Sequence, residues 1–183
     1  MCTVRNATHQ LVGVTCALGA SRALGLEAVE IAAMGTAAVC GSWLPDVDRV
    51  GARVHRRSRL ERRSLLAGAL GLVGRLPLVA VAVVARHRGV THSLSACALL
   101  GAVAVLFGSW LPPPGLLLAA GVVVGYSAHV LADACTPAGV QLWAPFSRRR
   151  VWLAPRRVRV RTGSLREGLV AMATAGVALV LVV

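Results

Sequence analysis

Long apolar runs alternate along this chain with short stretches in which arginine is concentrated. Within the runs the apolar residues are nearly continuous and do not alternate with polar residues, which favours helices over strands. A helix needs about 20 apolar residues to cross a bilayer, and a spanning backbone must satisfy its own hydrogen bonds. Six runs approach that length: residues 10–25, 28–45, 65–85, 93–111, 115–134 and 165–183.

The composition agrees with a membrane protein. Of the 183 residues, 56% are hydrophobic and only 15% are charged, which is more apolar surface than one soluble core could hide. The sequence therefore predicts an all-α, polytopic integral-membrane bundle of about five spanning helices, formed by residues 1–183 as a single domain.

The arginine-rich stretches predict the orientation. Loops rich in basic residues lie on the cytoplasmic side of membrane proteins, so we expect the N-terminus and the basic loops in the cytoplasm of an inner (cytoplasmic) membrane protein. A full crossing by residues 65–85 would place Arg86 and Arg88 outside. Pro77 interrupts this run near its middle, where it removes a helix hydrogen bond. We therefore predict a re-entrant or interfacial hairpin at residues 65–85.

A second basic stretch has a different period. Arg157, Arg159 and Arg161 alternate with Val158 and Val160, which predicts a short basic β-ribbon near residues 150–162. Its arginine face could rest on anionic headgroups, and a solvated cytoplasmic loop is the alternative. The formal net charge of +13 also raises nucleic acid as a partner, but only 4% of the residues are aromatic, so no nucleic-acid partner is expected.

The few ionisable residues gather at the ends of apolar runs, where such groups usually mark function. His129 and Asp133 are four residues apart, so on a helix they point from one face and could bind a metal. A hydrogen bond that packs the bundle is the alternative for this pair. Asp46 and Asp48 follow a proline, and they could act as ligand and general base or be exposed helix-end charges.

Histidines complete the candidate cluster. His87 and His92 are five residues apart, too far around a helix to face one metal, but Gly89 permits a turn between them. We then expect Thr91 to cap the next helix, with His92 in its first turn. His9 lies at the start of the first run. Under the predicted topology all of these side chains share one side of the membrane, which predicts a single pocket that holds one or two divalent ions.

The motifs TH, LPDVD, HRGVTHS and HVLADACTPAGVQLWAPF, in this order, resemble those of the YdjM-like family of bacterial and archaeal inner-membrane proteins, described as predicted metal-dependent hydrolases. The TGSLRE stretch that ends at Glu167 resembles a further family feature, for which the sequence suggests no role. The resemblance implies metal-site roles for His9, Asp46, Asp48, His87, His92, His129 and Asp133, supported by Arg88, Thr91, Ser93, Thr136 and Gln141.

Together these patterns predict a membrane-bound hydrolase that uses a metal-activated water on an ester or phosphoester of a lipid or lipid-linked substrate. The expected ion is zinc, with manganese or iron as alternatives. The expected ligands are His9, Asp48, His92, His129 and Asp133, and the expected catalytic residues are Asp46, His87, Arg88 and His92. The competing hypothesis is a non-enzymatic membrane protein, either a transporter of metal ions or protons or a scaffold.

Overall fold

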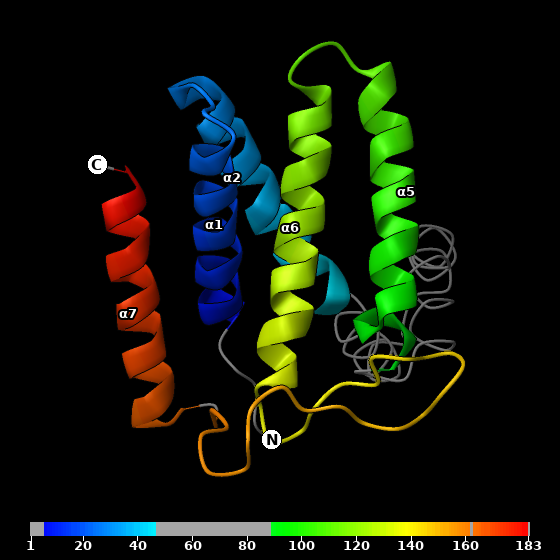
Figure 1. The fold of residues 1–183 in the computed structure, drawn as a ribbon, viewed down its shortest axis with the longest axis vertical. Coiled ribbons are helices and arrows are strands. Elements are labelled where there is room, and N and C mark those ends of the chain that lie inside the picture. The colour runs from blue at the N-terminus through cyan, green and yellow to red at the C-terminus, as the bar shows by residue number, and fades with distance from the viewer. Residues whose placement is uncertain (1–5, 47–88, 162, 183) are drawn as a thin grey trace, which may run out of the picture.

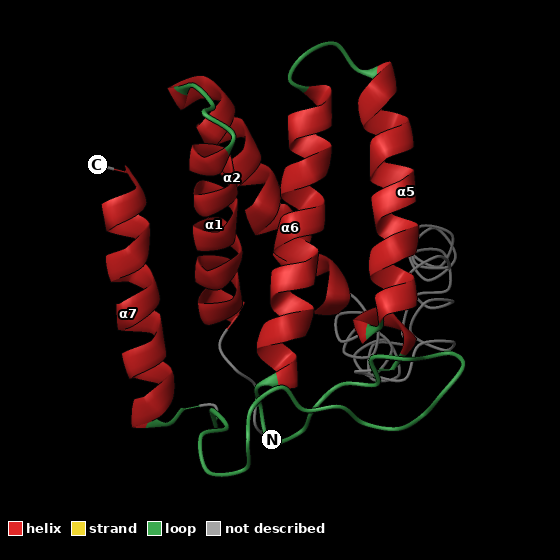
Figure 2. Ribbon diagram, viewed as in Figure 1, coloured by secondary structure: helices red, strands yellow, loops and turns green. Residues whose placement is uncertain are grey.

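A computed structural model describes residues 6–46, 89–161 and 163–182, and all of the regular structure in these ranges is helical (Figures 1 and 2). The elements in these ranges are α1 (Asn6–Ala23), α2 (Ala28–Trp43), the 3-10 turns η1 (Leu44–Asp46) and η2 (Val90–His92), α5 (Leu94–Trp110), α6 (Gly115–Ala134) and α7 (Leu165–Val182).

The helices lie side by side and alternate in direction (Figure 1). Helices α1, α5 and α7 begin at one end of the bundle, where α2 and α6 finish, and the loop that follows α6 runs beneath this end. We call it the site end. The arginines between residues 148 and 161 belong to this loop, so the basic loop and the polar helix ends lie together, as the charge pattern predicted.

Among the described residues, three segments are long and apolar enough to cross a membrane: Ala28–Asp46, Gly115–Ala134 and Leu165–Val182. Helix α5 is apolar but shorter. The prediction of an all-α membrane protein is therefore confirmed, whereas five crossings remain a prediction. The hairpin predicted at residues 65–85 lies outside the described residues.

The predicted β-ribbon is wrong. Within the described ranges there is no strand, and the one β-bridge that occurs there joins Val140 to Val151. The backbone N–H groups of Leu153 and Val160 instead donate to the carbonyls of Ala134 and Cys135, at 3.0 and 3.2 Å. The last carbonyls of a helix lack partners within it. The arginine-rich segment therefore binds the end of α6 and forms no ribbon of its own.

Small residues let three helices approach closely. The Cα atom of Gly125 in α6 lies 3.4 Å from the position that a Cβ atom on Gly13 of α1 would occupy. A Cβ atom on Gly125 would itself overlap the backbone of Ala38 in α2, and one on Gly121 would overlap that of Met34. Close backbone approach of this kind is typical of helices packed within membranes.

Helix α7 packs on α1 and leaves most of its side chains exposed. Polar contacts secure it along its length. The Thr15 hydroxyl reaches the carbonyl of Thr174 at 3.4 Å, and the Arg22 guanidinium donates to the carbonyls of Leu181 and Val182 at 2.7 and 2.9 Å. Arg22 thus satisfies carbonyls that the end of α7 would otherwise leave without partners.

We predict that Gly125→Ala destabilises the protein by about 2 kcal/mol or more, because the added methyl group forces α2 and α6 apart. Gly101→Ala in α5 is the matched control, since a Cβ atom there meets nothing within 4 Å. The control should be neutral or slightly stabilising, because alanine is the better helix former. Thermal unfolding in detergent measures both. Equal melting temperatures would contradict the proposed tight packing.

Candidate metal centre

Four helical segments bring five ionisable side chains together at the site end. His9 comes from the first turn of α1, Asp46 from η1, His92 from η2, and His129 and Asp133 from α6. In α6 the two ligand candidates continue the four-residue spacing of Gly121 and Gly125, so they lie on the stripe that faces α1 and α2. The packing stripe therefore delivers both side chains to the junction of the helices.

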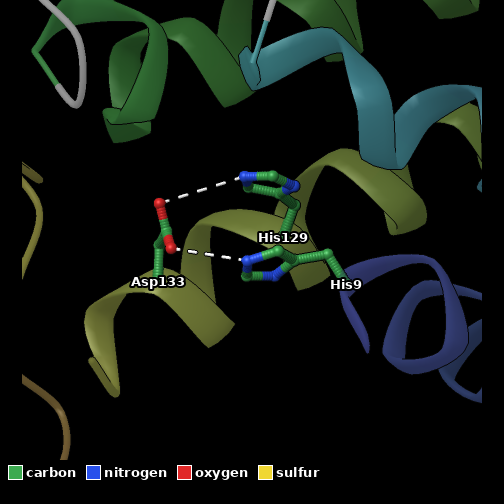
Figure 3. A group of neighbouring side chains, drawn as sticks. All are labelled: His9, His129 and Asp133. Atoms are coloured by element: carbon green, nitrogen blue, oxygen red, sulfur yellow. Dashed lines mark ion pairs between the residues drawn. The ribbon is translucent and has the colours of Figure 1, made fainter. Parts of the chain in front are cut away.

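The Asp133 carboxylate faces three imidazoles. Its Oδ1 atom lies 3.5 Å from His9 Nε2, and its Oδ2 atom lies 3.4 Å from His92 Nε2 and 3.9 Å from His129 Nε2. Figure 3 shows His9 and His129 approaching the carboxylate from the same side. These separations exceed the roughly 2.7–3.2 Å of an ordinary hydrogen bond. The four side chains therefore surround one point, at separations longer than ordinary hydrogen bonds.

The tautomer of His129 follows from its second nitrogen. Nδ1 lies 2.7 Å from the carbonyl oxygen of Ser42 in α2, an acceptor only, so Nδ1 carries the proton and donates it. In the neutral ring Nε2 then holds a lone pair directed toward Asp133. Within the described part of the chain, Nε2 has no hydrogen-bond partner. A histidine oriented through its other nitrogen by a backbone carbonyl is the usual arrangement of a metal ligand.

Burial favours a cation at this point. His9, His92, His129 and Asp133 are each no more than 3% exposed. The rings of His9 and His129 stack with centroids 4.1 Å apart, and His92 meets His129 edge-on at 5.4 Å. The Nε2 lone pair of His129 faces the Asp133 carboxylate, and a cation between them would remove their mutual repulsion. A divalent ion suits this position.

The distances suit such an ion. Two ligands at about 2.0–2.2 Å from zinc in tetrahedral geometry lie about 3.3 Å apart, close to the spacings around Asp133. Candidate ligand atoms of His9, His129 and Asp133 all lie within 4.8 Å of one another, and so do those of Asp46, His92 and His129. His129 belongs to both groups. Each group thus supplies the imidazole and carboxylate donors that zinc, iron or manganese bind.

The turn that carries His92 differs from the prediction. Thr91 does not cap α5. Ser93 does, since its hydroxyl accepts from the Ala96 N–H at 3.2 Å, and His92 closes a 3-10 turn before the helix begins. The Tyr126 hydroxyl donates to the Thr91 carbonyl, and the Thr91 hydroxyl lies 3.1 Å from His92 Nδ1. Tyr126 thus ties this turn to α6 and orients His92.

The other predicted residues have different outcomes. The Thr136 hydroxyl donates to the Asp133 carbonyl at 2.8 Å, just after the last turn of α6. Gln141 lies in the loop that follows α6. Asp48, His87 and Arg88 lie outside the described residues, so their roles remain predictions. The metal-ligand roles of the residues that do converge are likewise still predictions.

Two contributors were missed in the sequence, the Ser42 carbonyl and Tyr126, and a third, Glu167, was noted without a role. Tyr126 is the one tyrosine of the chain and lies three residues before His129, on the same face of α6, which was an available signal. Backbone carbonyls carry no such signal. Glu167 had one, because Ser164 and Glu167 form the S-x-x-E pattern of a helix start.

Glu167 links α7 to the first turn of α1. It is 5% exposed and accepts hydrogen bonds from the Thr8 hydroxyl at 3.2 Å and from the Gly163 N–H at 2.6 Å. Gly163 has a φ of 74°, a conformation that glycine adopts readily. Since Thr8 precedes His9, this contact fixes the segment that carries one of the three imidazoles.

Comparison with known proteins agrees with the sequence motifs. The family described as YdjM inner membrane protein matches residues 4–183. Two relatives named Inner membrane protein YdjM, from Escherichia coli (strain K12) and Shigella flexneri, are each 34% identical over 145 residues, which is 75% of this chain and 63% of the relative. The chain thus spans less than two thirds of their length. No solved structure matches it. Because the family match covers nearly the whole sequence, the chain belongs to the YdjM inner membrane protein family.

Proposed function

We propose that this protein is a metal-dependent hydrolase of the inner membrane that cleaves an ester or phosphoester of a lipid or lipid-linked substrate. The observation that carries the proposal is the buried Asp133 carboxylate facing the Nε2 atoms of three histidines. Zinc is the ion that we favour, with manganese and iron as alternatives.

The roles of the residues follow from their positions. His9, His129 and Asp133 hold the ion, and the Ser42 carbonyl keeps His129 in the tautomer that can do so. A bound divalent ion supplies Lewis acidity, which lowers the pKa of a coordinated water toward about 7. Asp46 lies beside His92 and His129, and it takes the proton from the attacking water.

Two further roles depend on residues outside the described ranges. We propose that Arg88 stabilises the negative charge that develops in the transition state and that His87 acts as an additional acid or base. Asp48 is proposed as one more ligand. All three flank segments that end or begin at the site end, namely η1 and η2.

The location of the centre suggests the kind of substrate. The candidate ligands lie toward helix ends, where apolar helices meet a basic loop. We propose that this end lies where headgroups meet hydrocarbon. We propose five crossings, with the N-terminus and the basic loops in the cytoplasm. A transporter would instead place its ionisable residues near the bilayer midplane, so the end position favours catalysis.

We predict that purified protein binds one equivalent of a divalent metal and that Asp133→Asn and His129→Ala do not. In the wild type, free metal at about 100 times its Kd should stabilise the fold by about 2.7 kcal/mol over the metal-free protein, whereas neither variant should respond. Elemental analysis and melting with and without chelator measure this. Glu30→Gln, which changes an acid in the first turn of α2, is the control and should match the wild type. Wild-type protein without stoichiometric metal would overturn the site.

We also predict that Asp46→Asn lowers the rate of lipid phosphoester hydrolysis by about 100-fold while metal content is retained, because it removes a base and leaves the principal ligands in place. Product release from liposomes containing the reconstituted protein gives the rate. Loss of the metal from Asp46→Asn would make Asp46 a ligand instead of a base. Metal flux into sealed vesicles without any lipid turnover, abolished in His129→Ala, would replace the hydrolase by a transporter.

A further inference from the structure

A second polar feature of the site end lies between the loop after α6 and the start of α7. A cavity of about 730 Å³ opens there, within the size range of small-molecule sites. Its described lining contains four arginines and no acidic residue: Pro137, Arg156, Arg159, Arg161, Ser164, Leu165 and Arg166. None of these side chains belongs to the candidate metal centre.

Two of the four arginines are positioned by neutral groups. Arg159 donates through Nε to the carbonyl of Ala154 at 3.0 Å, and its guanidinium lies 4.8 Å from the ring centroid of Trp152. Arg166 donates through Nη1 to the carbonyl of Arg157 at 2.5 Å. Carbonyls and an aromatic face orient a guanidinium without cancelling its charge. The cavity therefore keeps a concentrated positive charge.

The chemistry of the lining selects a phosphate group. Guanidinium groups bind phosphate oxygens through paired, charge-assisted hydrogen bonds. Several arginines around one cavity exceed the single charge of a phosphodiester. They suit a phosphomonoester, which carries about −1.5 to −2 at neutral pH.

The apolar surface beside the cavity distinguishes a lipid from a free anion. Leu165 lines the cavity and is 89% exposed, and Leu169 and Met172 are exposed further along α7. Their spacing of four and three residues places them on one face of the helix. An acyl chain can follow this face from the cavity toward the far end of α7, in the direction of the bilayer interior.

We infer that this cavity is a binding site for an anionic lipid with a phosphomonoester head, whose phosphate lies among Arg156, Arg159, Arg161 and Arg166 and whose acyl chain lies along α7. The site extends the proposed function but does not depend on it, because no metal ligand takes part. Ser164 also borders a smaller cavity lined by Thr8 and Glu167, so the lipid head lies near the contact that fixes the first turn of α1.

The test uses the full chain in neutral detergent with chelator present, so that hydrolysis cannot occur. Phosphatidate, phosphatidylcholine and inorganic phosphate are titrated separately, and bound ligand is measured by native mass spectrometry and calorimetry. We expect phosphatidate to bind with a clear preference over phosphatidylcholine. Inorganic phosphate should bind more weakly than phosphatidate, because it lacks the acyl chain.

Two double variants with the same change of charge locate the site. Arg156→Gln with Arg161→Gln should weaken phosphatidate binding about 30-fold, because the loss of each arginine should weaken binding roughly fivefold and the two losses multiply. Arg148→Gln with Arg149→Gln, which change two arginines of the same loop outside the cavity lining, should change it less than twofold. Equal losses in both variants would mean diffuse attraction to the loop and would overturn the site. Phosphate binding as tight as phosphatidate binding would overturn the lipid assignment.

Discussion

The close approach of α1, α2 and α6 is the constraint on which the rest of the structure depends. At the junction of Gly13, Ala38 and Gly125 the three backbones nearly touch, and no side chain larger than hydrogen fits at Gly125. In a bilayer no hydrophobic force pulls apolar helices together, so close packing and polar contacts must do so. The same proximity lets the Ser42 carbonyl of α2 reach His129 of α6 and places the His9 ring of α1 against the His129 ring. Packing and site geometry are therefore one property of these helices.

The membrane helices and the pairing of His129 with Asp133 could be predicted from the sequence, because both depend on local periodicity. Four-residue spacing is enough to place His129 and Asp133 on one helix face, and continuous apolar runs are enough to identify α6 and α7 as membrane helices. The alternating arginines led to the wrong prediction of a β-ribbon, because a strand requires a partner strand. The sequence pattern cannot show that carbonyls at the end of α6 accept the backbone N–H groups of this segment instead. The predicted Thr91 cap of α5 was likewise wrong because a 3-10 turn, which Tyr126 secures from another helix, precedes the helix and leaves Ser93 as the cap.

The two polar features of the site end have opposite electrostatic character. The candidate metal centre combines carboxylate oxygens with the ring nitrogens of histidines, a donor set that suits a cation, whereas the neighbouring arginine cavity attracts anions. They share a structural connection. The carbonyl of Asp133 accepts from Thr136, the carbonyl of Ala134 accepts from the arginine-bearing loop, and Glu167 joins α7 to the turn before His9. The loop thus completes the end of the helix that carries the central carboxylate.

The attachment of α7 has a consequence for how the chain can change in evolution. This helix meets the bundle through α1, and its contacts with Thr8, Thr15 and Arg22 are four hydrogen bonds, three of which use only the backbone of α7. A backbone acceptor is preserved whatever side chain surrounds it. Helix α7 can therefore exchange one lipophilic residue for another with little penalty, provided that Glu167 is kept. Helix α6 has no such freedom, since its glycines, histidine and aspartate occupy a single face, and mutational tolerance should differ sharply between these two membrane helices.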